Sequence, residues 1–210
     1  MKKNCLLCFL LFFSCHSALA GESLDSLLNV LDKTIKEADT YVQIKENKLH
    51  ELKKEARKTP PFSVERYNLN NDIYLEYKAY SSDSALHYLN ENMLLARQLN
   101  DKERELKIQL ELSYLLSSIG MYMEAADILN SIDRQTLPSS LLGHYYTCYE
   151  HVYFEAGAAQ PRYKMFASRY VKLSHAYRDS MQITLDPSSA TYLWLRETQL
   201  REAGKYDEAL

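Results

Sequence analysis

A six-residue pattern that occurs twice constrains the fold of this chain more than any other feature. Gly-x-Tyr-x-x-Ala stands at residues 120–125 and again at 204–209. The glycine suits the left-handed residue that ends many helices, and the small alanine lets a following helix approach closely. Alanines in the same context at positions 85, 125, 167 and 209 are spaced 40, 42 and 42 residues apart. A period of this length predicts stacked pairs of helices.

The composition agrees with a helical protein of one ordinary domain or two small ones. Hydrophobic residues make up 46% of the 210 residues and charged residues 25%, which is typical of a globular chain. Only 5 glycines and 5 prolines are present. This scarcity argues against a sheet-rich fold and against glycine loops that bind phosphate. We therefore predict an all-α fold.

The repeat pattern resembles the tetratricopeptide repeat (TPR), over residues 63–210. The unit that starts at residue 106 and the one that starts at residue 190 carry the large, Gly, Tyr and Ala positions of the family, although Gln109 departs from it. The units that start at residues 66 and 143 fit more loosely, and about five residues around Gln160 interrupt the latter. The resemblance implies a right-handed solenoid of antiparallel helix pairs. An unrelated helical bundle remains the alternative, because the motif is short.

The first 20 residues have the pattern of a signal peptide. Lys2 and Lys3 precede an apolar run at residues 6–13, and small residues at 18–20 allow cleavage before Gly21. A loose lipobox at Cys15 gives an alternative, a lipid-anchored N-terminus. Without residues 1–20, 23 basic residues face 28 acidic ones, a net charge of −5. We therefore expect no nucleic-acid partner for this segment, since phosphate contacts dominate such binding.

Residues 21–60 predict a long amphipathic helix, extending over 24–57. Its apolar residues recur at alternating spacings of four and three and end before Pro60 and Pro61. The stripe is made of Leu24, Leu28, Leu31, Ile35, Ala38 and Val42. Such a helix either caps the repeats or pairs with a partner, so an oligomer could form through it. Residues 61–210 then hold the repeats.

The layout of a signal peptide, a long helix and irregular repeats resembles the exported N-terminal region of Bacteroidetes TPR-containing sensors. These proteins have an uncharacterised C-terminal domain and are described as transcriptional regulators. The resemblance implies a location on the periplasmic side of the inner membrane and a membrane span beyond residue 210. The last repeat stops at Leu210, so we expect the chain to be a fragment of a longer protein.

Residues with catalytic potential are few. The best cluster is His144, Cys148 and His151 on one helix, but His144 and His151 lie about 10.5 Å apart along the helix axis. One helix therefore cannot offer all three to one metal ion. Cys148 is the only cysteine after residue 20, so no internal disulfide is possible. We predict a chain that is not an enzyme and uses neither a metal nor a cofactor.

The family resemblance also implies a ligand groove, lined by the first helix of each pair. Aromatic residues are frequent at the positions concerned, which suits recognition of a protein or peptide partner. A carbohydrate-binding solenoid, using the same rings, is the alternative. The predicted groove residues are Tyr67, Asn70, Tyr74, Tyr77, Lys107, Leu110, Tyr114, Ser117, His144, Thr147, His151, Phe154, Thr191, Trp194, Thr198 and Arg201.

Two helix starts are also marked in the sequence. Asn100, with Glu103 three residues later, resembles a capping box for a helix at 101. Asp186 before Pro187 predicts the start of another helix.

Overall fold

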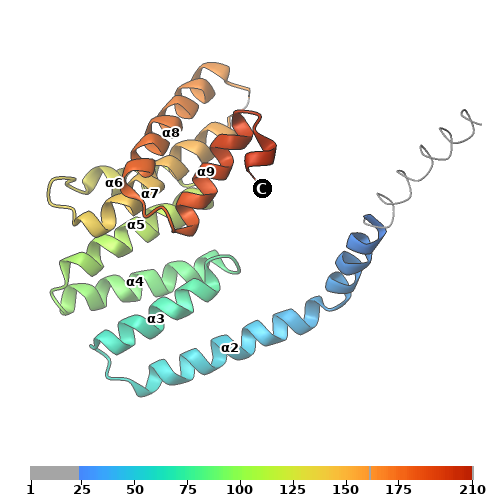
Figure 1. Cartoon of the computed structure of the whole chain (residues 1–210). Helices are drawn as coiled ribbons and strands as arrows, with labels where there is room; N and C mark the ends of the chain where they lie inside the picture. The colour runs from blue at the N-terminus through green and yellow to red at the C-terminus, as the bar shows by residue number, and fades with distance from the viewer. Residues whose placement is uncertain (1–23, 161, 210) are drawn as a thin grey trace, which may run out of the picture. The chain divides into compact units, whose positions relative to one another are not determined.

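The computed structural model describes residues 24–160 and 162–209, and all regular structure in those ranges is helical (Figure 1). The prediction of an all-α solenoid of helix pairs is confirmed. The predicted signal peptide and the alternative lipid site at Cys15 lie outside the described residues. Within the described ranges, no helix combines the length and the apolar character needed to cross a membrane.

The N-terminal unit, which ends at Glu51, is helical but contains a break. Residues 24–36 form one helix, and α2 (Ala38–Lys58) follows a turn at Glu37. The prediction of one continuous helix is wrong at this residue. Just before the break, the Thr34 hydroxyl donates a hydrogen bond to the Val30 carbonyl at 2.9 Å, a contact that often bends helices. The apolar stripe is exposed on both sides of the turn, at Leu28 as at Val42.

The second unit, from Leu52 onward, is a series of helix pairs. Its helices lie beside their neighbours in chain order, and α5 also contacts α7. The first helices of successive pairs therefore share one side of the solenoid (Figure 1). The pairs are α3 (Val64–Tyr77) with α4 (Ser82–Gln98), α5 (Lys102–Ser118) with α6 (Tyr122–Ser131), and α7 (Ser139–Ala158) with α8 (Lys164–Thr184), followed by α9 (Ala190–Glu202) and a short 3-10 helix, η1 (Tyr206–Glu208).

The two pattern glycines end helices as predicted. Gly120 has φ 89° and Gly204 has φ 73°, so both adopt the left-handed conformation. After Gly120, the Met121 amide donates back to the Leu116 carbonyl at 2.9 Å. This bond satisfies a carbonyl at the helix end and turns the chain into α6.

Both helices begin at residues other than those that the sequence indicated. Asn100 is itself a left-handed residue with φ 53°, and the Asp101 carboxylate caps α5 by accepting from the Arg104 amide at 3.0 Å. α9 begins after Ser189, whose hydroxyl accepts from the Tyr192 amide at 3.2 Å. In each case the residue nearest the first helical turn provides the cap, because only its oxygen reaches the free amides.

Close contacts between helices explain the repeated spacing of small residues along the chain. Ala85 and Ala125 are completely buried. Gly157 lies in the last turn of α7, and a Cβ there would lie 3.4 Å from the Cβ of Tyr170 on α8. Many tyrosines pack between helices instead of facing solvent; the Tyr149 and Tyr177 rings stack with centroids 4.7 Å apart.

Candidate functional site

A groove of about 970 Å³ opens along the side of the solenoid formed by the first helices. One ring comes from each of three helices: Tyr114 from α5, Phe154 from α7 and Trp194 from α9. Phe154 is 46% exposed and Trp194 47% exposed, so both offer apolar surface to a ligand. We call this the central groove. Its other lining residues are Lys78, Ser139, Ser140, Gly143, His144, Thr147, Glu150, His151, Glu155, Thr184, Leu185, Asp186, Ser189, Ala190 and Thr191.

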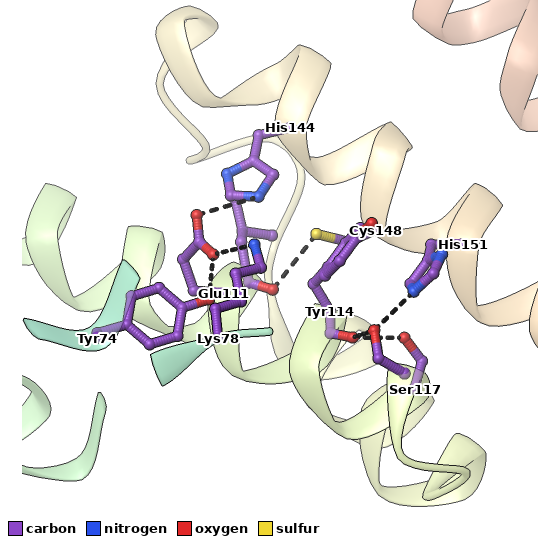
Figure 2. A network of polar contacts seen from close by, with 10 residues as sticks. Tyr74, Lys78, Glu111, Tyr114, Ser117, His144, Cys148 and His151 are labelled. Carbon is purple, nitrogen blue, oxygen red and sulfur yellow. Dashed lines mark hydrogen bonds and ion pairs between the residues drawn. The ribbon is translucent and has the colours of Figure 1, made fainter. Parts of the chain in front are cut away.

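A carboxylate on α5 contacts side chains from the α3 side and from α7, and two of its partners, Lys78 and His144, also line the central groove (Figure 2). Glu111 Oε2 accepts hydrogen bonds from the Tyr74 hydroxyl at 2.6 Å and from Lys78 Nζ at 3.1 Å, both from the α3 side. Its other oxygen, Oε1, lies 3.7 Å from His144 Nε2 on α7. This arrangement fixes α3, α5 and α7 relative to one another at the groove.

A stack of side chains continues from this network along the groove wall. Lys78 Nζ lies 4.4 Å from the centre of the Tyr114 ring, a cation–π contact. The Tyr114 ring stacks on the His151 imidazole with centroids 4.0 Å apart. His151 Nε2 is 2.9 Å from Ser118 Oγ, which also donates to the Tyr114 carbonyl at 2.9 Å. The imidazole is therefore held flat against α5.

Burial and neighbouring charges determine the protonation of these groups. Burial would raise the pKa of Glu111, but Lys78, His144 and the Tyr74 hydroxyl outweigh it and hold that pKa below its ordinary value. Burial lowers the pKa of His144, with Lys78 adding to the effect and Glu111 opposing it. Burial and the charge of Lys78 lower the pKa of His151 to about 4. These shifts favour an ionised Glu111 carboxylate and neutral imidazoles on His144 and His151 at neutral pH.

A second polar group ties α9 to the preceding pair. The carboxylate of Glu150, which is 2% exposed, accepts from Arg178 Nε at 2.8 Å and from the Ser174 hydroxyl at 2.9 Å. Arg178 Nη1 donates to Glu202 on α9 at 2.8 Å. Arg178 also lies 5.8 Å from the centre of the Phe154 ring. The pair therefore supports the floor of the central groove and anchors the helix that carries Trp194.

Only some of the residues predicted to line a ligand groove lie together in the structure. Seven predicted residues line the central groove: Tyr114, His144, Thr147, His151, Phe154, Thr191 and Trp194. Six others are buried and offer little or no surface to a ligand there: Tyr67, Asn70, Tyr74, Tyr77, Leu110 and Ser117. Lys107, Thr198 and Arg201 lie outside the groove lining, and Arg201 is paired with Glu197 at 2.9 Å.

Sequence reasoning missed the residues that supply the charge of the site. Lys78, Glu111, Glu150 and Arg178 fall outside the family's groove positions, so the motif gave no reason to select them. The one available signal was that Lys78 lies one turn after Tyr74, on the same face of a helix. The ion pairs themselves join residues from 24 to 33 positions apart, which sequence spacing cannot pair.

The three candidate ligands that the sequence offered on one helix, His144, Cys148 and His151, do not converge on one point. The Cys148 thiol is fully buried and donates to the Leu110 carbonyl at 3.3 Å, while His144 faces Glu111 and His151 faces Tyr114 (Figure 2). Burial raises the pKa of the Cys148 thiol well above its ordinary value, which disfavours a reactive thiolate. Over the described parts of the chain, no three acidic, histidine or cysteine side chains are placed to share a metal ion.

Comparison with known protein families assigns the chain to one of them. The model of the SusR N-terminal TPR domain matches residues 35–210. The chain belongs to this family. No curated protein and no solved structure matches it. The resemblance to the tetratricopeptide repeat is therefore confirmed, and the match to the SusR N-terminal TPR domain includes α2 as well as the helix pairs.

Proposed function

We propose that the central groove binds an extended peptide segment of a partner protein. The observation that carries this proposal is the placement of Tyr114, Phe154 and Trp194, from three successive first helices, in one groove. Aromatic rings offer a large apolar area at small entropic cost, and they are enriched where proteins recognise other proteins. A groove continuous over three helices suits a chain-like ligand better than a compact one.

The polar groups of the central groove support a binding role over a catalytic one. Glu111 is engaged by Tyr74 and Lys78, and Glu150 by Arg178. A general acid or base needs a proton to exchange near neutral pH. These carboxylates are instead held as ion-pair partners, so their role is to orient the groove walls. The chain thus serves as a non-enzymatic recognition module.

A carbohydrate ligand is the competing proposal, because half-exposed rings such as Phe154 and Trp194 also stack on sugars. Trp194 is the only tryptophan of the chain, so its fluorescence reports directly on the groove. We would titrate the protein with peptides selected from a random library and, separately, with a panel of oligosaccharides. Saturable changes with peptides alone support the proposal; changes with oligosaccharides alone would replace it.

Phe154→Ala and Phe166→Ala form a matched pair for this titration. Phe166 lies on α8 outside the central groove and is 49% exposed, close to the 46% of Phe154. We expect Phe154→Ala to weaken peptide binding about tenfold, equivalent to about 1.4 kcal/mol. Phe166→Ala should leave the affinity unchanged. Equal losses in both variants would place the ligand elsewhere.

We further propose that the chain is the sensing part of an exported regulator, on the periplasmic side of the inner membrane. The signal-peptide pattern of residues 1–20 and membership of the SusR family support this proposal. Anchoring would come from a membrane span beyond residue 210 or from lipidation of Cys15. The intact mass of the exported protein separates the two routes: cleavage before Gly21 leaves an unmodified N-terminus, whereas lipidation adds acyl mass at Cys15.

A further inference from the structure

A second, smaller cavity lies at the junction of the last turns of α2 with α3 and α4. It has a volume of about 210 Å³, and its walls carry Lys53, Arg57, Arg66, Asn70 and Tyr88. We propose that this basic cavity binds a compact oxyanion, a phosphate or carboxylate group, at a site separate from the central groove. The proposal does not depend on the function proposed above.

The charge of the basic cavity is strongly one-sided. Three cations line it, from Lys53, Arg57 and Arg66, against the single carboxylate of Glu91. The chain as a whole has a formal charge of −3, so this concentration of positive charge is local. A concave surface lined by one sign of charge raises the local concentration of ions of the opposite sign.

Two of the cations are held in place by hydrogen bonds. Arg66 donates from Nε and Nη2 to the hydroxyl and carbonyl of Thr59, at 2.9 Å each. Lys53 Nζ donates to the Tyr77 hydroxyl at 2.6 Å and lies 5.0 Å from the centre of that ring. Tyr77 in turn stacks on Tyr88 in the cavity wall. Side chains fixed in this way lose little entropy when an anion binds.

Hydrogen-bonding capacity remains for a ligand. Asn70 is only 6% exposed, and its amide makes no hydrogen bond within the described ranges of the chain. Arg57 is exposed and has no ion pair within those ranges. The Asn70 amide borders the cavity and has N–H groups that can donate to the oxygens of a bound anion. Guanidinium groups bind carboxylate and phosphate oxygens in a two-pronged geometry.

The pKa of the Tyr88 hydroxyl indicates that positive charges lie close to the basic cavity. Burial raises the pKa of the Tyr88 hydroxyl, while the charges of Lys53 and Arg57 act in the opposite direction. Both charges therefore lie close enough to the cavity wall to stabilise an anion there.

The test is a titration of the whole chain with inorganic phosphate and, separately, with citrate, at constant ionic strength kept with sodium chloride. Isothermal titration calorimetry measures saturable binding. Binding of phosphate alone identifies a phosphate site, and binding of citrate alone a carboxylate site. Absence of saturable binding for both anions would overturn the proposal.

Arg57→Gln and Arg97→Gln each remove one positive charge from an exposed arginine. Arg57 lines the basic cavity, whereas Arg97, near the end of α4, lies outside it. We expect Arg57→Gln to weaken anion binding at least tenfold and Arg97→Gln to change it less than twofold. Equal weakening by both variants would show a response to net charge alone, which contradicts a built site. Phe154→Ala in the central groove should leave anion binding unchanged.

Discussion

Glu111 carries the charge around which one end of the central groove is organised. Its carboxylate is 16% exposed and Lys78 32% exposed, so the pair is partly shielded from water. Glu111→Gln leaves the Lys78 ammonium without its counter-charge, and we expect the free energy of unfolding to fall by about 1–3 kcal/mol. Urea denaturation measures this loss. Glu124→Gln changes an exposed residue on α6, and its free energy of unfolding should lie within about 0.5 kcal/mol of the wild-type value.

His151 should make the protein less stable in acid. Its pKa is about 4 in the folded chain, below the ordinary histidine value of about 6.5, so the unfolded chain binds more protons between these values. The stabilisation is present above pH 6.5 and is lost as the pH falls toward 4. Since the ring is partly solvated, we expect a loss of about 1–2 kcal/mol at pH 4.5.

Comparison with His151→Gln isolates this contribution, because glutamine does not titrate. Chemical denaturation at pH 7.5 and 4.5 should show a smaller acid-induced loss in the variant than in the wild type. The lowered pKa of Glu111 acts at more acidic pH and affects both proteins alike. Equal losses in the two proteins would mean that His151 is protonated in the folded state.

At the scale of single elements, substitution by alanine should have different effects on stability at two glycines. Gly120 has φ 89°, where a side chain strains the backbone, so Gly120→Ala should destabilise by about 1–2 kcal/mol. Gly157 is helical in the last turn of α7, without a positive φ, and its added Cβ would meet only ordinary contacts, the nearest at 3.4 Å. Gly157→Ala should be neutral or stabilise by up to about 1 kcal/mol. Thermal unfolding of both variants checks the contrast, and a destabilised Gly157→Ala would show that α7 and α8 cannot separate.

The joint between α8 and α9 depends on one arginine. Arg178→Met leaves the buried Glu150 carboxylate without its cation, which should cost about 3–5 kcal/mol. Glu202→Gln removes the other partner, which is 50% exposed, and should cost less than about 1 kcal/mol. Adding Glu150→Gln to Arg178→Met should restore part of the loss. Without such a recovery, the arginine would act through packing rather than charge.

At the scale of the whole molecule, the N-terminal helices leave an apolar stripe in solvent. Leu24, Leu28, Leu31 and Ile35 are between 48 and 62% exposed, at the spacing of a coiled-coil seam. We propose that a second copy covers it. Leu28→Asp with Leu31→Asp should then reduce the mass measured by sedimentation to that of a monomer. Asn29→Asp, which lies off the seam, is the control; a monomeric wild type would contradict the proposal.

The sequence determined the helix pairs and their turns, because these depend on local patterns. The spacing of Ala85 and Ala125 and the left-handed turns at Gly120 and Gly204 follow from steric properties that hold in any context. The break at Glu37 was missed, since the apolar stripe continues across it without a change. Heptad spacing reports which face is apolar and not whether the helix is continuous.

Only the tertiary structure decided which residues form the site. The first pair supplies Lys78 in place of the predicted tyrosines, because Tyr74 turns toward Glu111 on α5 and Tyr77 packs with Lys53 of α2. A family position states which face of a helix a residue occupies, but its exposure depends on the neighbouring helices that cover that face. The ion pairs of Glu111 and Glu150 arise in the same way, from contacts between helices that lie far apart in the sequence.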